Sequence, residues 1–386
     1  MRAPIGDRTV QVVRHERKKR LSIRCTLSVT RILTRQVELC STIQNRIDSL
    51  FPNSPVSQFK NILTDLWRLG SSPWRSFRMR QFKSVGKVPI FVLFYHRIAN
   101  RHPNPWSMDF ATFKEQMLWM KDRFDMISME EVQHRIASGI NSRPAVSISF
   151  DDGYSENCEE ALPFLITEGI PTTYFVTTEH TTKQVPFPHD VEEGIELPTN
   201  TVESLRALAN AGIEIGAHTR SHPSVGSLTD PGQIFDEVIS ATREMELLID
   251  KKIRYFAFPF GQYRDLNVDA FKLLKEAGFE GVCSAYGGWN VPGEDPFHIQ
   301  RVHGDPNFSR MKNWLTYDPR IAKIARYDYC ESKATIDWTT HLENKQTEFV
   351  ISDDVDSDSV AKAEEANASV SESKPAAQPA AKISTK

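Results

Sequence analysis

Two adjacent carboxylates, Asp151 and Asp152, end the apolar run in "VSISFDDG" and are followed at once by Gly153. Like charges side by side raise the cost of ionising both groups, and a bound cation would relieve that cost. Two histidines, His218 and His222, follow another apolar run in "GIEIGAHTRSHP". Ionised Asp and neutral His are ligands for divalent transition metals, so this set of residue types could hold one metal ion.

The histidine pair has the i, i+4 spacing that binds zinc on some helices. The preceding residues are strand-like, however, and Ser221 and Pro223 favour a turn, so we expect His218 and His222 on a loop after a strand. Two alternatives stay open. Either histidine alone could be a hydrogen-bonded loop residue, and an Asp-Asp-Gly sequence alone is typical of a surface turn.

Neighbouring side chains on an extended chain point to opposite sides. Asp151 and Asp152 can therefore take different roles, one as metal ligand and the other as the group that accepts a proton. Gly153 would allow the sharp turn that brings the backbone close to a ligand.

The elements that position these residues are short apolar runs alternating with amphipathic stretches. The sequence predicts strands over 88–96, 146–150, 172–178, 213–218, 254–261, 280–286 and 298–303, and helices over 109–124, 156–169, 202–212, 232–250 and 269–279. This alternation indicates an α/β fold with a parallel sheet, in which reactive groups gather at the carboxyl ends of the strands. About seven strands suit a distorted, incomplete (β/α) barrel, and an open doubly wound sheet is the alternative.

The ordered motifs "SFDDG", "HTRSHP" and "FPFG" resemble those of the polysaccharide deacetylases of the NodB-homology type, carbohydrate esterase family 4, over residues 88–305. The resemblance implies a metal-dependent hydrolase that removes N-acetyl or O-acetyl groups from an acetylated glycan. It also implies one divalent metal, zinc first, with cobalt, manganese or nickel as alternatives. Carried over by position, Asp151 is the general base, and Asp152, His218 and His222 are the metal ligands.

The resemblance also assigns the remaining roles. The branch of the family that this chain resembles carries a "YH" strand end near the N-terminal side, and "VLFYHRI" makes His96 the general acid. His303 in "IQRVH" is the alternative acid. The backbone N–H of Phe260 would stabilise the oxyanion, and Tyr154 is expected to contact the substrate.

Two departures from the family pattern bear on catalysis. Ala257 stands where many members have an arginine that tethers the catalytic Asp. Arg254 would lie on the opposite face of its strand, and Arg301 is our hypothesis for the replacement. A catalytically impaired carbohydrate-binding relative is therefore one alternative function, and an adaptor for an anionic surface through the basic residues 1–86 is another. The second departure is Trp289, a loose counterpart of a family tryptophan, which could either pack in the core or bind sugar.

Charged residues are distributed unevenly along the chain. Residues 1–86 hold 17 Lys/Arg against 5 Asp/Glu, a net +12, within a chain of 386 residues whose formal net charge is −3. We expect residues 1–86 to form a basic, helical extension that could contact an anionic surface, with no nucleic-acid partner for the chain as a whole. The deacetylase domain is predicted over 87–318 and a C-terminal extension over 319–350. Residues 351–386 contain no aromatic side chain and are predicted to be disordered.

The remaining expectations concern location and the groove. Five cysteines without a CxxC pair suit a reducing compartment. No clear signal peptide or membrane span is recognised, so the expected location is cytoplasmic, with export left open. The segment from Thr178 to Thr199 is long for a connection and is expected to cover one side of the site.

Overall fold

The computed structural model describes residues 55–318 and 324–338, with side chains from residue 62 onward. The described residues up to Ala334 form one compact unit, and Thr335 begins a second. The predicted disordered tail over 351–386, most of the predicted extension over 319–350 and the first 54 residues of the basic arm lie outside the described residues. In the part of the chain that is described, no helix is long and apolar enough to cross a membrane.

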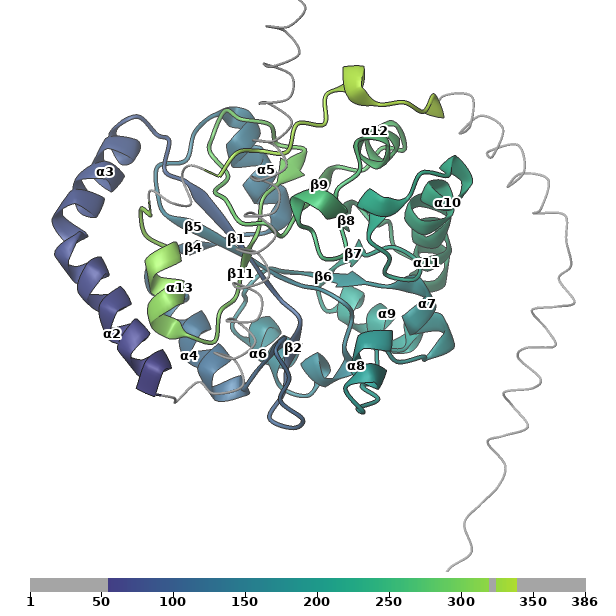
Figure 1. Cartoon of the computed structure of the whole chain (residues 1–386), viewed down its shortest axis with the longest axis horizontal. Coiled ribbons are helices and arrows are strands. Elements are labelled where there is room, and N and C mark those ends of the chain that lie inside the picture. Colours follow the sequence, from purple (N-terminus) through teal and green to yellow (C-terminus); the bar gives the residue numbers. More distant parts are fainter. Residues whose placement is uncertain (1–54, 319–323, 339–386) are drawn as a thin grey trace, which may run out of the picture. The chain divides into compact units, whose positions relative to one another are not determined.

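A parallel sheet forms the centre of the domain, with helices packed around it (Figure 1). Among the described residues its nine strands are β1 (Ile90–Tyr95), β4 (Asp125–Met126), β5 (Ala145–Phe150), β6 (Thr172–Val176), β7 (Glu214–Ala217), β8 (Tyr255–Ala257), β9 (Gly281–Cys283), β10 (His298–Ile299) and β11 (Val302–His303). Strands β1, β5 and β6 are buried along their whole length, which is expected of a parallel sheet covered on both faces.

The strand order shows that the sheet curls into an incomplete barrel. It runs β10-β9-β8-β7-β6-β5-β1-β11, with β4 beside β5. The order advances in one direction and does not reverse, as a doubly wound sheet would require. The single stretch 298–303 pairs with β9 through β10 and with β1 through β11, and therefore bridges the two ends of the sheet. The predicted fold class is confirmed.

The helices follow the predicted alternation, with additions. They are α2 (Pro55–Gly70), α3 (Ser72–Ser84), α4 (Phe110–Lys121), α5 (Met129–Ser138), α6 (Ala161–Thr167), α7 (Thr178–Lys183), α8 (Pro188–Glu192), α9 (Val202–Asn210), α10 (Pro231–Phe235), the π-helical η3 (Asp236–Ser240), α11 (Ala241–Ile249), α12 (Val268–Glu276) and α13 (Phe308–Trp314). Polar side chains cap several N-termini, as Asp109 does for α4 and Thr201 for α9. Helices α5 and α13 were not predicted, and the segment 178–199 contains the two short helices α7 and α8.

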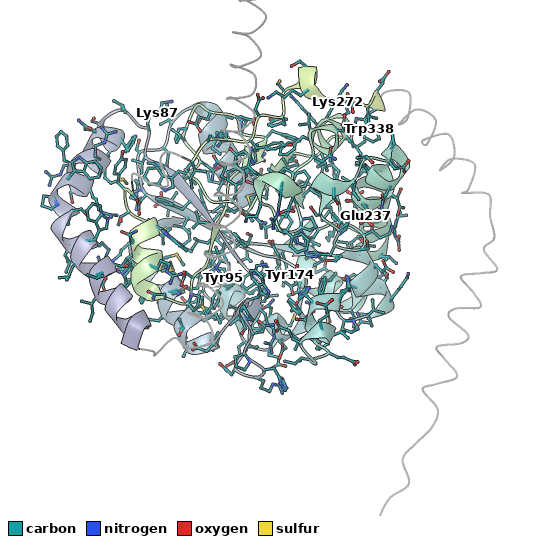
Figure 2. All side chains as sticks on the ribbon, in the orientation of Figure 1. Lys87, Tyr95, Tyr174, Glu237, Lys272 and Trp338 are labelled. Carbon is teal, nitrogen blue, oxygen red and sulfur yellow. The ribbon has the colours of Figure 1, made fainter. Side chains whose placement is uncertain are left out.

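The core fills the space inside and around the curled sheet. Tyr95 and Tyr174, labelled near the centre of Figure 2, come from β1 and β6 and are both fully buried. Their hydroxyls reach hydrogen-bond acceptors, at Gln116 for Tyr95 and at the carbonyl of Tyr154 for Tyr174. Trp289 is also buried, against the rings of Phe91 and Tyr317, so its role in this structure is packing.

Candidate active site

Three of the predicted side chains meet at the carboxyl ends of the strands. Ligand atoms of Asp152, His218 and His222 all lie within 4.8 Å of one another. Asp152 follows β5, and both histidines follow β7. The carboxylate Oδ1 of Asp152 lies 3.5 Å from Nε2 of His218 and 3.2 Å from Nε2 of His222. The structure therefore brings together the three residues that the sequence suggested as metal ligands.

The geometry of this group suits a divalent cation. The buried Oδ1 of Asp152 accepts no hydrogen bond within the described residues, although both imidazoles are near. Nδ1 of His218 lies 2.7 Å from the carbonyl oxygen of Ala257. This ring nitrogen must carry the proton, which leaves the Nε2 lone pair free for a metal. An unpartnered buried carboxylate oxygen facing imidazole nitrogens is a donor set that a zinc-like ion would satisfy.

The electrostatics favour the protonation states that bind metal. Burial alone would raise the pKa of Asp152, but the imidazoles beside it hold that pKa well below its usual range. Burial also lowers the pKa of His222, although Asp152 opposes the shift. The carboxylate is therefore ionised and His222 is neutral near neutral pH.

Backbone strain is concentrated at this site. Asp152, Thr219, His222 and Phe260 all have positive φ, between 60° and 71°. This region is unfavourable for residues other than glycine, above all for β-branched Thr and bulky Phe. Such strain persists only where the surrounding structure enforces it, and it is typical of functional sites.

Glu237 holds the loop that carries the two histidines. Its carboxylate accepts hydrogen bonds from the backbone N–H groups of Arg220 and Ser221 and from the Ser221 hydroxyl. Glu237 lies in the π-helical segment η3 and is labelled in Figure 2. A π-helical turn inside a longer helix often marks a functional site. The sequence does not single out Glu237, because this residue is remote from every motif and one more acid on an amphipathic helix gives no signal.

Asp151 is paired with Arg301 and is separate from the ligand group. The guanidinium donates two hydrogen bonds, from Nη1 to Oδ1 at 2.6 Å and from Nη2 to Oδ2 at 2.8 Å. Arg301 is fully buried, donates from Nε to the carbonyl of Ser284, and lies over the rings of Phe94 and Phe175. Burial would raise the pKa of Asp151, but the charge of Arg301 outweighs that effect and lowers it.

Arg254, by contrast, binds far from Asp151. It pairs with Glu214, Glu130 and Glu280, which agrees with its expected place on the opposite face. Ala257 contributes its carbonyl oxygen to His218 and no side-chain contact to Asp151. The arginine that contacts Asp151 is therefore Arg301, from the stretch between β10 and β11.

The two histidines proposed as acids lie side by side. The rings of His96, after β1, and His303, at the end of β11, have centroids 5.9 Å apart. Burial lowers the pKa of His96, and the carboxylates of Asp152 and Asp151 oppose that shift. Burial lowers the pKa of His303 to about 3, with His96 adding to the effect. Two carboxylates, Asp151 and Asp152, favour the protonated form of His96, whereas Asp151 alone does so for His303.

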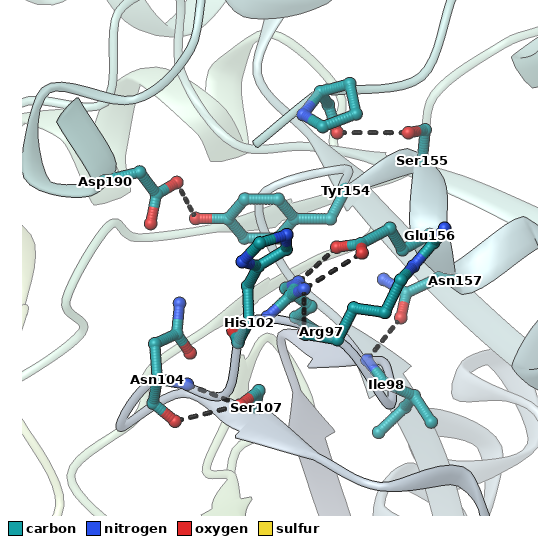
Figure 3. Close-up of polar contacts among 12 residues, drawn as sticks. Arg97, Ile98, His102, Asn104, Ser107, Tyr154, Ser155, Glu156, Asn157 and Asp190 are labelled. Carbon is teal, nitrogen blue, oxygen red and sulfur yellow. Dashed lines mark hydrogen bonds and ion pairs between the residues drawn. The ribbon is translucent and has the colours of Figure 1, made fainter. Parts of the chain in front are cut away.

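A short loop brings an exposed ring beside His96. Trp106 has its ring centroid 5.2 Å from that of His96 and half of its surface exposed. The loop joins β2 (Arg97–Ile98) to β3 (Ser107–Met108). Arg97 holds this loop in place. Its guanidinium forms an ion pair with Glu156 (Figure 3) and donates hydrogen bonds to the carbonyls of residues 101 and 102 in the loop.

Tyr154 and Phe260 are placed very differently. Tyr154 is almost fully buried, and its hydroxyl donates to Asp190 of α8 at 2.8 Å (Figure 3). This contact attaches the segment 178–199 to the site. Phe260 is 55% exposed, and its ring centroid lies 5.0 Å from that of His222. In the described part of the chain its backbone N–H has no hydrogen-bond acceptor.

Phe260 also lines an open depression next to the ligand group. The depression has a volume of about 440 Å³ and is bounded by Ser224, Gly226, Ser227, Phe260, Arg264 and Asp265. This volume falls within the range of small-molecule sites in proteins. Arg264 extends into solvent, with 80% of its side chain exposed.

Comparison with known proteins agrees with this geometry. The profile of the family "Polysaccharide deacetylase" matches residues 138–282, which include Asp151, Asp152, His218, His222 and Phe260. His96 and Arg301 lie outside the match.

Two relatives are similar to this chain over part of its length. The chain is 24% identical over 225 residues to YxkH of Bacillus subtilis, a candidate polysaccharide deacetylase, covering 58% of this chain and 73% of the relative. It is 24% identical over 158 residues to a chitooligosaccharide deacetylase of a Bradyrhizobium species, covering 40% and 60%.

Among solved structures, the deacetylase PplD of Streptococcus pyogenes is 18% identical with a TM-score of 0.49, covering 59% of this chain and 99% of that one. IcaB from Ammonifex degensii is 20% identical with a TM-score of 0.49, covering 59% and 97%. The family profile spans both carboxylates and both histidines of the ligand group, and over residues 138–282 the chain is similar to the polysaccharide deacetylases.

Proposed function

We propose that this protein is a metal-dependent deacetylase that hydrolyses N-acetyl groups on an amino-sugar glycan, with O-acetyl groups as further candidates. The observation that carries the proposal is the placement of Asp151, paired with Arg301, beside the Asp152, His218 and His222 group. Members of the family are hydrolases that act on carbon–nitrogen bonds of acetylated polysaccharides.

Asp152, His218 and His222 would hold the metal, with zinc first and cobalt, manganese or nickel as alternatives. A divalent ion bound there would polarise the acetyl carbonyl and lower the pKa of water from about 15.7 towards about 7. Asp151 accepts the proton of the attacking water, for which it must be ionised. The paired guanidinium of Arg301 keeps it so and fixes the orientation of its carboxylate.

His96 gives its proton to the leaving nitrogen as the carbon–nitrogen bond breaks, and the products are acetate and the free amine. The backbone N–H of Phe260 donates to the carbonyl oxygen while negative charge develops on it, and such a donor is worth about 10²- to 10³-fold in rate. Ala257 suggested a catalytically impaired relative. The Arg301–Asp151 pair supplies the interaction that Ala257 lacks, so the geometry favours the enzyme.

The substrate is expected to be a chain of several sugar units. Phe260 forms a wall shared by the ligand group and the adjacent depression. In that depression Ser224 and Ser227 already donate their hydroxyl protons, to Asp265 and to the Ser224 carbonyl, so their oxygens can accept from sugar hydroxyls. The Bradyrhizobium relative is named for chitooligosaccharides, which makes N-acetylglucosamine oligomers the first substrates to test.

Acetate release from N-acetylglucosamine oligomers of two to six units, and from an O-acetylated xylan, tests the proposal. We expect release from the N-acetylated oligomers, loss of activity after treatment with a chelator, and recovery with Zn²⁺ or Co²⁺. The Asp151→Asn variant should bind zinc and release no acetate. A metal-loaded, folded protein that released no acetate from any acetylated glycan would support a binding protein in place of an enzyme.

A further inference from the structure

Helix α2 has its polar side towards the domain and its apolar side towards solvent. Asp65 accepts a hydrogen bond from the hydroxyl of Ser309 on α13 at 2.7 Å, and Arg68 pairs with Asp65 at 3.2 Å. Figure 1 shows α2 (purple) lying along the outer side of α13. A surface helix of a globular protein normally has the reverse arrangement, with its apolar stripe on the core.

The side chains that α2 exposes continue onto α3. Arg75 of α3 is buried and donates to Asn313 and Thr316, next to α13, so one side of α3 is also fixed to the domain. Phe77 of α3 is exposed, and Trp74 is still 45% exposed although its ring packs edge-on against Tyr317 at a centroid distance of 5.0 Å. We define the outer apolar face as the following residues, each between 45% and 61% exposed: Ile62, Leu63, Leu66, Trp67, Leu69, Trp74 and Phe77.

An apolar face of this kind is uncommon on a protein that is covered only by water. Large exposed apolar patches usually mark a surface that contacts a membrane or another protein. Single exposed apolar residues are ordinary, and Leu247 on α11 is one example, at 79% exposed. Seven such side chains on two consecutive helices call for a partner.

The charges around the outer apolar face are of one sign. Residues 55–86 contain six Lys/Arg and a single acid, Asp65, which is turned inward onto Ser309. The basic residues of α3 include Arg78, Arg80 and Lys83, and the last two are exposed. An apolar face with Trp and Leu, flanked by Lys and Arg, is the pattern of helices that lie in the surface of an anionic membrane.

We propose that the outer apolar face inserts into the surface of an anionic lipid bilayer, with Trp67 and Trp74 at the level of the headgroups. Charge argues against a second copy of the chain as the occupant, because two faces with the same basic flanks would repel. Charge argues equally against residues 1–54 as the occupant, because they hold 11 Lys/Arg and 4 Asp/Glu and are therefore also basic. This proposal is independent of the proposed catalytic activity.

Binding of the full chain to phospholipid vesicles tests it. Vesicles of phosphatidylcholine alone are compared with vesicles that contain one quarter phosphatidylglycerol, by co-sedimentation and by the tryptophan emission maximum. We expect binding to the anionic vesicles, a shift of the emission to shorter wavelength, and weaker binding at high salt. The Leu66→Glu/Leu69→Glu variant should bind at least 10-fold more weakly, and Leu247→Glu is the matched control.

Several results would overturn the proposal. One is no binding of the native chain to anionic vesicles, and another is equal binding by the native chain and the double variant. A dimer that the double variant dissociates would show that a second copy covers the face. Faster proteolysis of residues 1–54 in the double variant, without vesicles, would show that this segment covers it. Both substituted residues are exposed, and circular dichroism checks that the fold is kept.

Discussion

Arg301 binds the carboxylate of Asp151 through two parallel hydrogen bonds, although 150 residues separate the two in the chain. The pairing depends on the curl of the sheet. Asp151 directly follows β5, whereas Arg301 lies in the short link between β10 and β11 that bridges the two ends of the sheet. The stretch that bridges these two ends therefore also orients the proposed base.

Replacing Arg301 with Lys should lower kcat about 10- to 100-fold, because a lysine cannot reproduce the bidentate contact. The pKa of Asp151 should rise as the contact weakens. Because the base must be ionised, the acid limb of the pH–kcat profile should move to higher pH. Zinc content should not change.

Arg254→Lys is the matched control for this experiment, since Arg254 is bound to Glu214 on the other face. Arg301→Met would leave a buried carboxylate unpaired and could cost about 3–5 kcal/mol of stability, so the lysine variant is the better probe. An unchanged pH profile in Arg301→Lys would show that Arg301 does not tune the base.

The roles of the adjacent Asp151 and Asp152 should be distinguishable when zinc binding and turnover are measured independently. Asp152→Asn should weaken zinc binding by more than about 100-fold, beyond the usual effect of losing a residue that only supports a ligand. Asp151→Asn should keep zinc while losing turnover. Zinc content by mass spectrometry and affinity by calorimetry give the first readout, and acetate release gives the second. Equal zinc loss in both variants would mean that both carboxylates are ligands.

His96→Ala should reduce kcat about 100-fold or more at unchanged zinc content, because proton transfer to the leaving nitrogen would be lost. His303→Ala should have a smaller effect, since burial holds the pKa of His303 at about 3 and disfavours its protonated form. Single-turnover rates with an N-acetylglucosamine oligomer provide the measurement. If His303→Ala were the more damaging change, the acid role would pass to His303.

The sequence predicted the fold and the ligand group because the signals were local. Apolar runs ending in Asp151-Asp152 or in His218 identify strands and their carboxyl ends, and parallel strands place those ends together. Arg301 could only be a hypothesis, because its contact depends on the curl of the sheet. Glu237 was missed, and α2 was predicted only as part of a helical extension, without the direction of its apolar side. Periodicity identifies an amphipathic face but does not say whether that face meets the core or solvent.

A subsite beside Phe260 predicts a dependence on substrate length. Arg264→Ala should raise KM for a tetramer or longer oligomer about 5- to 20-fold, the loss expected for about 1–2 kcal/mol of hydrogen bonding to sugar hydroxyls. The KM for an N-acetylglucosamine dimer should change little. Lys275→Ala, at an exposed position on α12, is the matched control. Equal effects on short and long oligomers would place Arg264 outside the binding path.

His298, which is not one of the proposed metal ligands, should make the free energy of unfolding depend on pH. Its Nε2 contacts the Ser284 hydroxyl at 2.9 Å, and its Nδ1 has no hydrogen-bond partner among the described residues. Burial, helped by the charge of Arg326, lowers the pKa of His298 from 6.5 to about 3. Below pH 6.5 the unfolded chain binds a proton that the folded protein excludes, so the free energy of unfolding should fall as pH falls. The slope from this residue is at most about 1.4 kcal/mol per pH unit.

Urea unfolding at pH 7.5 and 5.5, with chelator present at both, measures this effect. Native protein should be less stable at pH 5.5, and His298→Gln should reduce that difference because glutamine does not titrate. His134→Gln removes a histidine that is 73% exposed and should leave the difference unchanged. If His298→Gln kept the full pH dependence, the destabilisation would have to come from other groups. His303 is the first of these to test, because its pKa is lowered to about 3 as well.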